Sequence, residues 1–325
     1  MADILVTLAG RNLDRPRLEK LAAPFGGCAY FSDLPEAQRI PAAAAARVVL
    51  AFKPYKEMGP ALAALHQGQL LQIMSAGLDD LPFDRIPAGV TVAGNSGAYA
   101  RPMAEHALAM VLCLAKRLRE EDAAMRRGEF NQMVPNLLLA GKKAAVLGLG
   151  GAGKAVARLL AALGMEVHAL NTSGKSDEPV AYVGTRENLD MILADAQVVV
   201  LTLPYSKLTH AMIGARELSL PRPDAILVNV ARGEIIDQRA LYEHLHAHPE
   251  FRAGIESWWV EPLRHGRFEL AYPLLELPNL LASPHNSFNV SGWQELGLDA
   301  AFANIGRFLR GEAITGLMRP QLHRI

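Results

Sequence analysis

The 325-residue sequence has few cysteines, no excess of either charge and no long hydrophobic run. Its two cysteines, Cys28 and Cys113, are far apart, so the sequence predicts neither a disulfide framework nor a metal site. Lysine plus arginine and aspartate plus glutamate both number 33. This balance gives no electrostatic reason to expect nucleic acid or an anionic membrane surface as a partner.

The most apolar segment, residues 103–118, is too short to span a membrane, which takes about 18–20 apolar residues, and it carries Glu105 and His106 near its start. The first residues, MADILVTLAG, lack the basic and apolar regions of a signal peptide. We therefore expect a cytoplasmic protein. Because 325 residues are many for a single core, we also expect two domains.

Short apolar runs alternate with longer segments of helical composition. The runs are rich in Val, Leu and Ile without strict alternation, which is typical of parallel strands buried on both faces. They lie at 4–9, 47–52, 70–75, 90–94, 143–150, 166–171, 196–204, 225–231, 252–257 and 279–284. With helices predicted between them, this order indicates two doubly wound parallel-sheet α/β domains, before and after a helix at 103–118. A last helix, near 293–310, is expected to return to the first half.

A glycine-rich turn follows the apolar run at 143–150. Gly148, Gly150 and Gly153 form a G-x-G-x-x-G pattern, with Ala152 in its fifth position, and a helical segment comes next. Glycines in this position permit a tight turn, and the helix N-terminus presents free N–H groups to a pyrophosphate. We interpret the turn as a dinucleotide site; the alternative is a glycine-rich turn without a ligand.

The loop LNTSGKSDEP, residues 170–179, follows the second strand of this unit. Asn171 stands where NAD enzymes carry an acidic residue that binds the adenosine ribose. A neutral side chain there removes the repulsion of a 2′-phosphate, and Ser173 and Lys175 can donate to it. The sequence thus favours NADP over NAD, although a simple polar turn beside bound NAD would have the same composition.

Three further strand ends carry polar side chains. Arg232 follows the run at 225–231, Glu261 precedes Pro262, and His285 follows Pro284. Ligands of open parallel sheets bind outside the carboxyl ends of the strands, so these side chains are expected to converge. A histidine can exchange a proton with an oxygen while hydride moves at the carbon, a carboxylate can orient the ring, and an arginine can hold a substrate carboxylate.

Together these motifs resemble the D-isomer-specific 2-hydroxy acid dehydrogenases of the glyoxylate/hydroxypyruvate reductase type. The resemblance covers nearly the whole chain. Beside the glycine turn it includes NVARGEIID, the Glu-Pro of GIESWWVEP, YPLLELPNLLASPH, SAGLDDLP (75–82) and GNSGAYARPMAEHAL (94–108). It implies reversible hydride transfer between NAD(P)H and a small 2-keto or 2-hydroxy acid. Because an NADP-type loop favours a reductive role, reduction of glyoxylate or hydroxypyruvate is the leading expectation.

The resemblance also implies a role for each site residue. His285 would be the general acid in reduction, Glu261 would hold it, and Arg232 would bind the substrate's oxygens. The substrate carboxylate would be received by a segment of small residues, Ser75, Ala76 and Gly77. The implied cofactor contacts, beyond the glycine turn and the loop at 170–179, are Pro204, Val230 and Glu256.

The same resemblance implies two Rossmann-like domains with a cleft between them. Residues 1–98 with 287–325 would bind the substrate, and residues 99–286 the dinucleotide. A homodimer is expected through residues 103–118 and an arm at 127–138. The alternative is a cofactor-sensing regulatory protein of the same fold, such as the corepressors that resemble these enzymes.

Some positions depart from the family pattern or stay open. Glu256 replaces the usual Asp expected at the nicotinamide carboxamide, and Tyr99 stands where Asn is common. Glu261, by contrast, excludes the Gln of formate-oxidising relatives and indicates a 2-keto or 2-hydroxy acid substrate. Trp258, Trp259 and Trp293 suit the wall of a substrate pocket and aromatic packing equally well.

Overall fold

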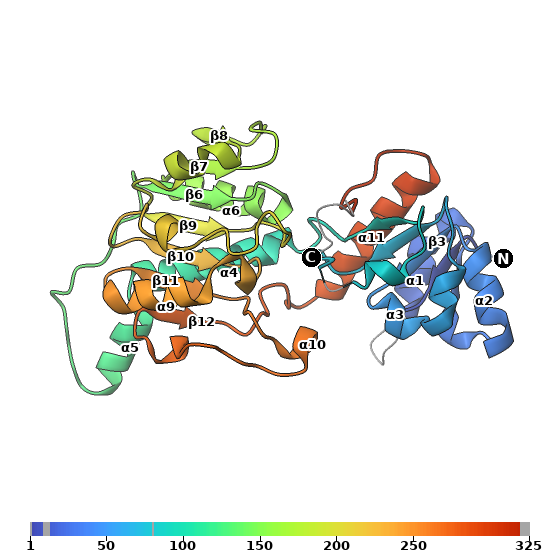
Figure 1. Cartoon of the computed structure of the whole chain (residues 1–325), viewed down its shortest axis with the longest axis horizontal. Helices are drawn as coiled ribbons and strands as arrows, with labels where there is room; N and C mark the ends of the chain where they lie inside the picture. Colours follow the sequence, from blue (N-terminus) through green and yellow to red (C-terminus); the bar gives the residue numbers. More distant parts are fainter. Residues whose placement is uncertain (1, 9–13, 80, 319–325) are drawn as a thin grey trace. The chain divides into compact units, whose positions relative to one another are not determined.

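The computed structural model describes residues 2–8, 14–79 and 81–318, and it divides into two compact units. The first comprises the described residues of Met1–Tyr99 and Ser291–Ile325, and the second is Ala100–Val290. Each unit is built on one sheet, and the sheet of the first unit is ordered β2-β1-β3-β4-β5. The sheet of the second unit is ordered β12-β11-β10-β9-β6-β7-β8 (Figure 1). Every pair of neighbouring strands is parallel. The predicted class of doubly wound parallel-sheet α/β domains is confirmed.

The first unit has short strands joined by helical segments. Its strands are β1 Ile4–Val6, β2 Cys28–Tyr30, β3 Val48–Ala51, β4 Leu70–Ile73 and β5 Thr91–Ala93. Its α-helices are α1 Arg15–Ala22, α2 Glu36–Ala45, α3 Pro54–Glu57 and α11 Trp293–Leu309. Its 3₁₀ helices are η1 Ala23–Phe25, η2 Phe31–Asp33, η3 Gly59–Ala64 and η4 Phe83–Arg85.

The second unit follows the same plan with a larger sheet. Its strands are β6 Lys143–Leu147, β7 Glu166–Leu170, β8 Tyr182–Gly184, β9 Val198–Leu201, β10 Ile226–Asn229, β11 Arg252–Ile255 and β12 Leu280–Ala282. Its α-helices are α4 Ala100–Ala115, α5 Leu118–Arg126, α6 Gly151–Ala162, α7 Leu189–Leu193, α8 Ala215–Leu218, α9 Gln238–Ala247 and α10 Pro262–His265. Its 3₁₀ helices are η5 Arg186–Asn188, η6 Gly233–Ile235 and η7 Leu274–Glu276.

Both faces of the larger sheet are covered by helices. Alternate residues of β6 point to opposite faces: Val146 packs in the cluster that includes α4 and α6, and Leu147 in the cluster that includes α7 and α9. Strands buried on both faces need apolar residues at every position, which explains the unbroken runs in the sequence. In the first unit, α1 and α11 cover one face of the sheet, and α2 and η3 cover the other.

The sequence analysis did not predict the strands β2 and β8. β2 and β8 are only three residues long, lie at the outer edge of their sheets and are only partly buried, so neither has a long run rich in Val, Leu and Ile to mark it. The helix expected at 103–118 begins earlier, at Ala100, and ends at Ala115. Within the described parts of the chain, none of the helices combines the length and the apolar composition needed to cross a membrane.

Candidate active site

The glycine turn joins β6 to α6. Gly148 has a φ of +103°, and a Cβ on it would lie 2.9 Å from the backbone N of Leu203. A Cβ on Gly153 would overlap the carbonyl oxygen of Gly148, so helix and strand pack too closely for any side chain there. Gly150, the N-cap of α6, faces open space instead. The turn is therefore tightly packed inside and accessible at the helix N-terminus, where a pyrophosphate binds in folds of this kind.

The loop after β7 is shaped by the side chain of Asn171. Its Oδ1 accepts hydrogen bonds from the N–H groups of Ser173 (3.0 Å) and Gly174 (2.7 Å), and its Nδ2 donates to the carbonyl of Lys175 (2.7 Å). This Asx-type turn leaves the side chains of Ser173 and Lys175 exposed. Asn171 thus has a structural task in building the loop, whatever it does for a cofactor.

A buried carboxylate fastens the same loop to α6. Glu178, whose side chain is only 6% exposed, accepts two hydrogen bonds from Arg158, at 2.6 and 2.7 Å. Lys154, in the first turns of α6, lies 3.6 Å from the same carboxylate. The hydrogen bonds from Arg158 hold the pKa of Glu178 below its usual range, so this carboxylate is ionised and its charge is neutralised locally.

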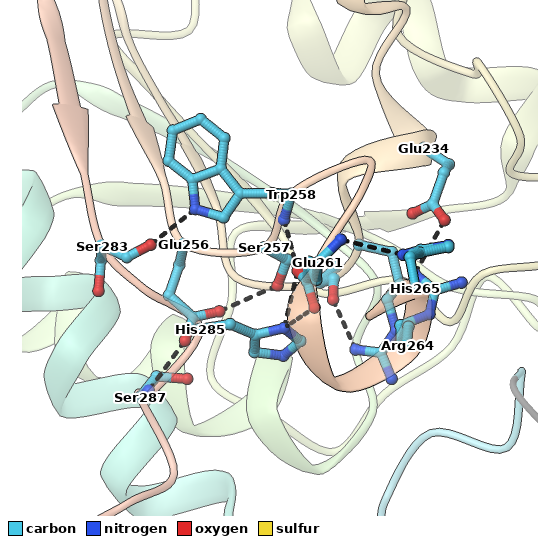
Figure 2. A network of polar contacts seen from close by, with 12 residues as sticks. Glu234, Glu256, Ser257, Trp258, Glu261, Arg264, His265, Ser283, His285 and Ser287 are labelled. Carbon is cyan, nitrogen blue, oxygen red and sulfur yellow. Dashed lines mark hydrogen bonds and ion pairs between the residues drawn. The ribbon is translucent and has the colours of Figure 1, made fainter. Parts of the chain in front are cut away.

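The three polar strand-end residues come from neighbouring strands. Arg232 caps η6 after β10, Glu261 caps α10 after β11, and His285 follows β12. Nδ1 of His285 lies 2.7 and 2.9 Å from the two carboxylate oxygens of Glu261 (Figure 2). His285 has a φ of +51°, a sparsely populated conformation for a residue with a side chain. Such strain persists only where the surroundings enforce it, and it is frequent at functional sites.

Glu261 is buried and nevertheless ionised. Burial raises its pKa, but the hydrogen bond and charge of His285, the N–H of Trp258 at 2.6 Å and the charge of Arg232 together lower it below its usual range. An ionised carboxylate accepts and does not donate, so Nδ1 of His285 carries the shared proton. Nε2 of the ring is left as the atom that can exchange a proton with a ligand.

Glu256 fixes the segment that follows β12. Its carbonyl accepts the N–H of His285 at 3.0 Å, and its carboxylate accepts the N–H of Ser287 at 2.8 Å and the hydroxyl of Ser257 at 2.9 Å (Figure 2). The residue has no exposed surface. Both carboxylate oxygens therefore already accept a hydrogen bond within the second unit, and the expected contact with the nicotinamide stays a prediction.

A second ion pair joins the segments that carry Arg232 and Glu261. Arg264 on α10 donates to Glu234 in η6 at 2.8 Å, and both side chains are 16% exposed. His265, also on α10, accepts the N–H of Glu261 on its Nδ1 at 2.9 Å. The sequence analysis assigned these residues no role, because Glu234 and Arg264 are 30 positions apart and nothing in NVARGEIID, the motif that contains Glu234, indicates this partner.

The three tryptophans lie in different surroundings. Trp258 lines a cavity beside His285, and its Nε1 donates to the carbonyl of Ser283 at 2.8 Å. Trp259 packs against the core of the second unit. Trp293 belongs to the first unit, where its ring lies 6.4 Å from that of Tyr99.

The remaining predicted site residues occupy strand ends. Ser75, after β4 in the first unit, donates from its hydroxyl to the carbonyl of Gly77 at 2.8 Å, which holds a tight loop with Ala76 exposed at its tip. In the second unit, Pro204 is exposed after β9, and Val230 is buried after β10. Contact of any of them with a ligand stays a prediction.

The sequence model of the NAD binding domain of D-isomer specific 2-hydroxyacid dehydrogenases matches residues 108–287, more than half of the chain. The chain belongs to the D-isomer specific 2-hydroxyacid dehydrogenase family. It is therefore an oxidoreductase that acts on 2-hydroxy acids with a nicotinamide cofactor, and the family predicted from the sequence is confirmed.

Individual relatives carry related names. A glyoxylate reductase of Thermococcus gammatolerans is 29% identical over 73% of this chain and 72% of its own length. A hydroxypyruvate reductase of Thermotoga maritima is 29% identical over 68% of this chain and 72% of its own length. A solved structure from Pyrobaculum aerophilum, provisionally named a formate dehydrogenase, is 28% identical and superposes with a TM-score of 0.79 over 99% of each chain.

Proposed function

We propose that the chain reduces a small 2-keto acid to the 2-hydroxy acid with His285 as the general acid. The observation that carries this role is the 2.7 Å contact between Nδ1 of His285 and the buried, ionised Glu261. As hydride adds to the carbonyl carbon, Nε2 delivers a proton to the carbonyl oxygen, and Glu261 stabilises the protonated ring before that transfer. In oxidation the same atoms move in reverse.

Arg232 is the proposed anchor for the substrate's carboxylate and carbonyl oxygens. The charge of Arg232 contributes to lowering the pKa of the Glu261 carboxyl, which supports a position of the guanidinium near the proton-transfer pair. The planar guanidinium can bind a carboxylate through two parallel hydrogen bonds. The loop of Ser75, Ala76 and Gly77 is proposed to receive the same carboxylate with its backbone N–H groups.

NADP(H) is the proposed cofactor in preference to NAD(H). No carboxylate stands at position 171, the exposed Ser173 and Lys175 offer donors, and the nearby charge of Glu178 is neutralised by Arg158 and Lys154. Each of these features lowers the electrostatic cost of a 2′-phosphate at this loop.

Glyoxylate and hydroxypyruvate are the proposed substrates among the smallest keto acids. The names of two relatives support them. Oxidation of formate is disfavoured, although one structural relative carries that name, because Glu261 provides the carboxylate that a proton-transferring histidine needs and formate oxidation releases no proton from a hydroxyl.

A homodimer and a division of labour between the domains are further parts of the proposal. The substrate would be bound by residues 1–98 with 287–325 and the dinucleotide by residues 99–286. The dimer contact would use 103–118 and the arm at 127–138. Phe130, Met133 and Leu138 in that arm are between 68% and 92% exposed, which is unusual for large apolar side chains and typical of a protein interface. A cytoplasmic location remains the prediction from the sequence.

The test compares the rates at which NADPH and NADH are oxidised in the presence of different keto acids. NADPH and NADH are each combined with glyoxylate, hydroxypyruvate, pyruvate and phenylpyruvate, and absorbance loss at the nicotinamide band is followed. Turnover with at least one acid and a preference for NADPH are expected. Binding of a cofactor without turnover of any acid would favour the regulatory alternative, and a preference for NADH would show that the 170–179 loop is only a turn.

A further inference from the structure

A cavity of about 540 Å³ opens beside the proton-transfer pair, entirely within the second unit. His285 and Glu261 form part of its wall, so any group bound in it lies next to the residues of the proton-transfer pair. The rest of the wall is contributed by the segment after β11, by α10 and the segment that follows it, and by the end of β12 with the residues after it. Its large side chains are Trp258, Leu263, Phe268 and Leu275.

The wall of this cavity offers few free polar groups beside its apolar side chains. Trp258 and Phe268 meet edge to face, with ring centroids 5.5 Å apart, which is a favourable aromatic arrangement. The indole N–H of Trp258 is already donated to the carbonyl of Ser283, so the ring presents carbon to the cavity. The hydroxyl of Ser283 is hydrogen-bonded to His106 at 3.0 Å and to Asn286.

The size of the cavity exceeds what the smallest keto acids need. An apolar cavity of roughly 150 Å³ is sufficient for a benzene molecule. Glyoxylate has no side chain to place there. The hydroxymethyl group of hydroxypyruvate would lose its hydration against an apolar wall, and an acidic side chain would meet the charge of Glu261. The ligand that gains most from this wall is a large hydrocarbon group.

We propose that this cavity, the side-chain pocket, binds the apolar side chain of the keto acid, and that the enzyme also reduces 2-keto acids with aromatic or branched aliphatic side chains. The inference rests on the hydride-transfer function proposed above, and it adds a class of larger substrates to glyoxylate and hydroxypyruvate. Hydrophobic discrimination is about 10- to 200-fold per methylene-sized difference in a fitted pocket. A kcat/KM at least tenfold higher for phenylpyruvate and 4-methyl-2-oxopentanoate than for glyoxylate is therefore expected.

The experiment measures kcat/KM for these three acids in the full-length enzyme and in two variants. Leu263→Trp fills the side-chain pocket from a position that is 76% exposed on α10, so folding should tolerate it. It should lower the phenylpyruvate-to-glyoxylate ratio at least tenfold. The matched control, Met191→Trp, places the same indole on α7 at a position that is 43% exposed and outside the pocket, and it should leave the ratio unchanged.

The results separate the pocket from the reaction itself. A wild-type enzyme that turns over glyoxylate but neither larger acid would overturn the side-chain pocket and leave hydride transfer standing. A ratio in Leu263→Trp equal to that of the wild type would do the same. Absence of turnover with all three acids would refute the proposed hydride transfer, and this inference with it.

Discussion

Nδ1 of His285 lies 2.7 Å from a carboxylate oxygen of Glu261, although the two residues follow different strands, β12 and β11. The carboxylate is buried and ionised, so it can stabilise a positive charge on the imidazole at a site with little solvent screening. The surrounding contacts serve this pair: Glu256 holds the backbone on one side, and the Glu234–Arg264 pair links the neighbouring segments on the other. The predictions below test these contacts separately.

Shortening Glu256 should impair catalysis more than binding. In Glu256→Asp the carboxylate loses one methylene and withdraws from the N–H of Ser287, now 2.8 Å away. A misplacement of about 1 Å near a reacting group can reduce the rate as much as 10²-fold. We expect kcat to fall at least tenfold with KM nearly unchanged. Glu256→Gln retains an acceptor and should keep most of kcat; equal losses in the two variants would contradict this positioning role.

Breaking the ion pair between Glu234 and Arg264 should lower the free energy of unfolding. Arg264→Met leaves a mostly buried carboxylate without its cation, and one oxygen of Glu234 already has no hydrogen-bond partner in the described structure. A destabilisation of about 1–3 kcal/mol is expected from urea unfolding. The double variant Glu234→Gln/Arg264→Met should recover part of it. A loss in the double variant equal to the sum of the losses in Glu234→Gln and Arg264→Met would show that the pair contributes no coupling energy.

Asn171→Asp tests the cofactor loop with nearly the same shape. An aspartate retains the oxygen that accepts from Ser173 and Gly174, but its second oxygen replaces the amide that donates to the carbonyl of Lys175 and is repelled by that carbonyl. Its charge should repel a 2′-phosphate, so KM for NADPH is expected to rise about tenfold, or ~1.4 kcal/mol, while KM for NADH does not rise. Asn171→Ala, which removes the whole turn, should affect both cofactors. The same factor for both cofactors in Asn171→Asp would contradict a phosphate site here.

His244 should make the enzyme less stable in mild acid. Burial, and secondarily the charge of His248, lower its pKa from 6.5 to about 4, so the folded state prefers the neutral ring. A lowered pKa gives stability that is present above pH 6.5 and lost as the pH falls toward 4. The urea midpoint of His244→Phe should therefore fall less than that of the wild type between pH 7 and pH 4. His246→Gln, an exposed neighbour, serves as the control; parallel curves for wild type and His244→Phe would refute the assignment.

Much of this architecture can be predicted from the sequence, because the apolar runs of the strands and the glycines of the tight turns can be recognised in short stretches of the chain. Continuous apolar runs such as β9 and β10 report burial on both faces, and glycines such as Gly148 and Gly153 stand where backbones touch. The strand ends with Arg232, Glu261 and His285 follow from the parallel topology. Short edge strands such as β2 carry no such pattern.

The contacts that the sequence could not provide are those between distant segments. The direction of the Glu256 side chain depends on where the N–H of Ser287 lies, 31 positions further along the chain. The size of the side-chain pocket depends on how Trp258, Phe268 and Leu275 pack, and their order in the sequence does not determine that packing.

The most direct test of the account is His285→Ala, measured for both turnover and cofactor binding. Turnover of the best keto acid with NADPH should fall at least 10²-fold, the contribution expected of a general acid. The Kd for NADPH, read from nicotinamide fluorescence, should stay within about twofold of the wild type, because the glycine turn and the 170–179 loop are separate from the His285–Glu261 pair. Turnover near the wild-type rate would contradict the assignment of proton transfer to His285.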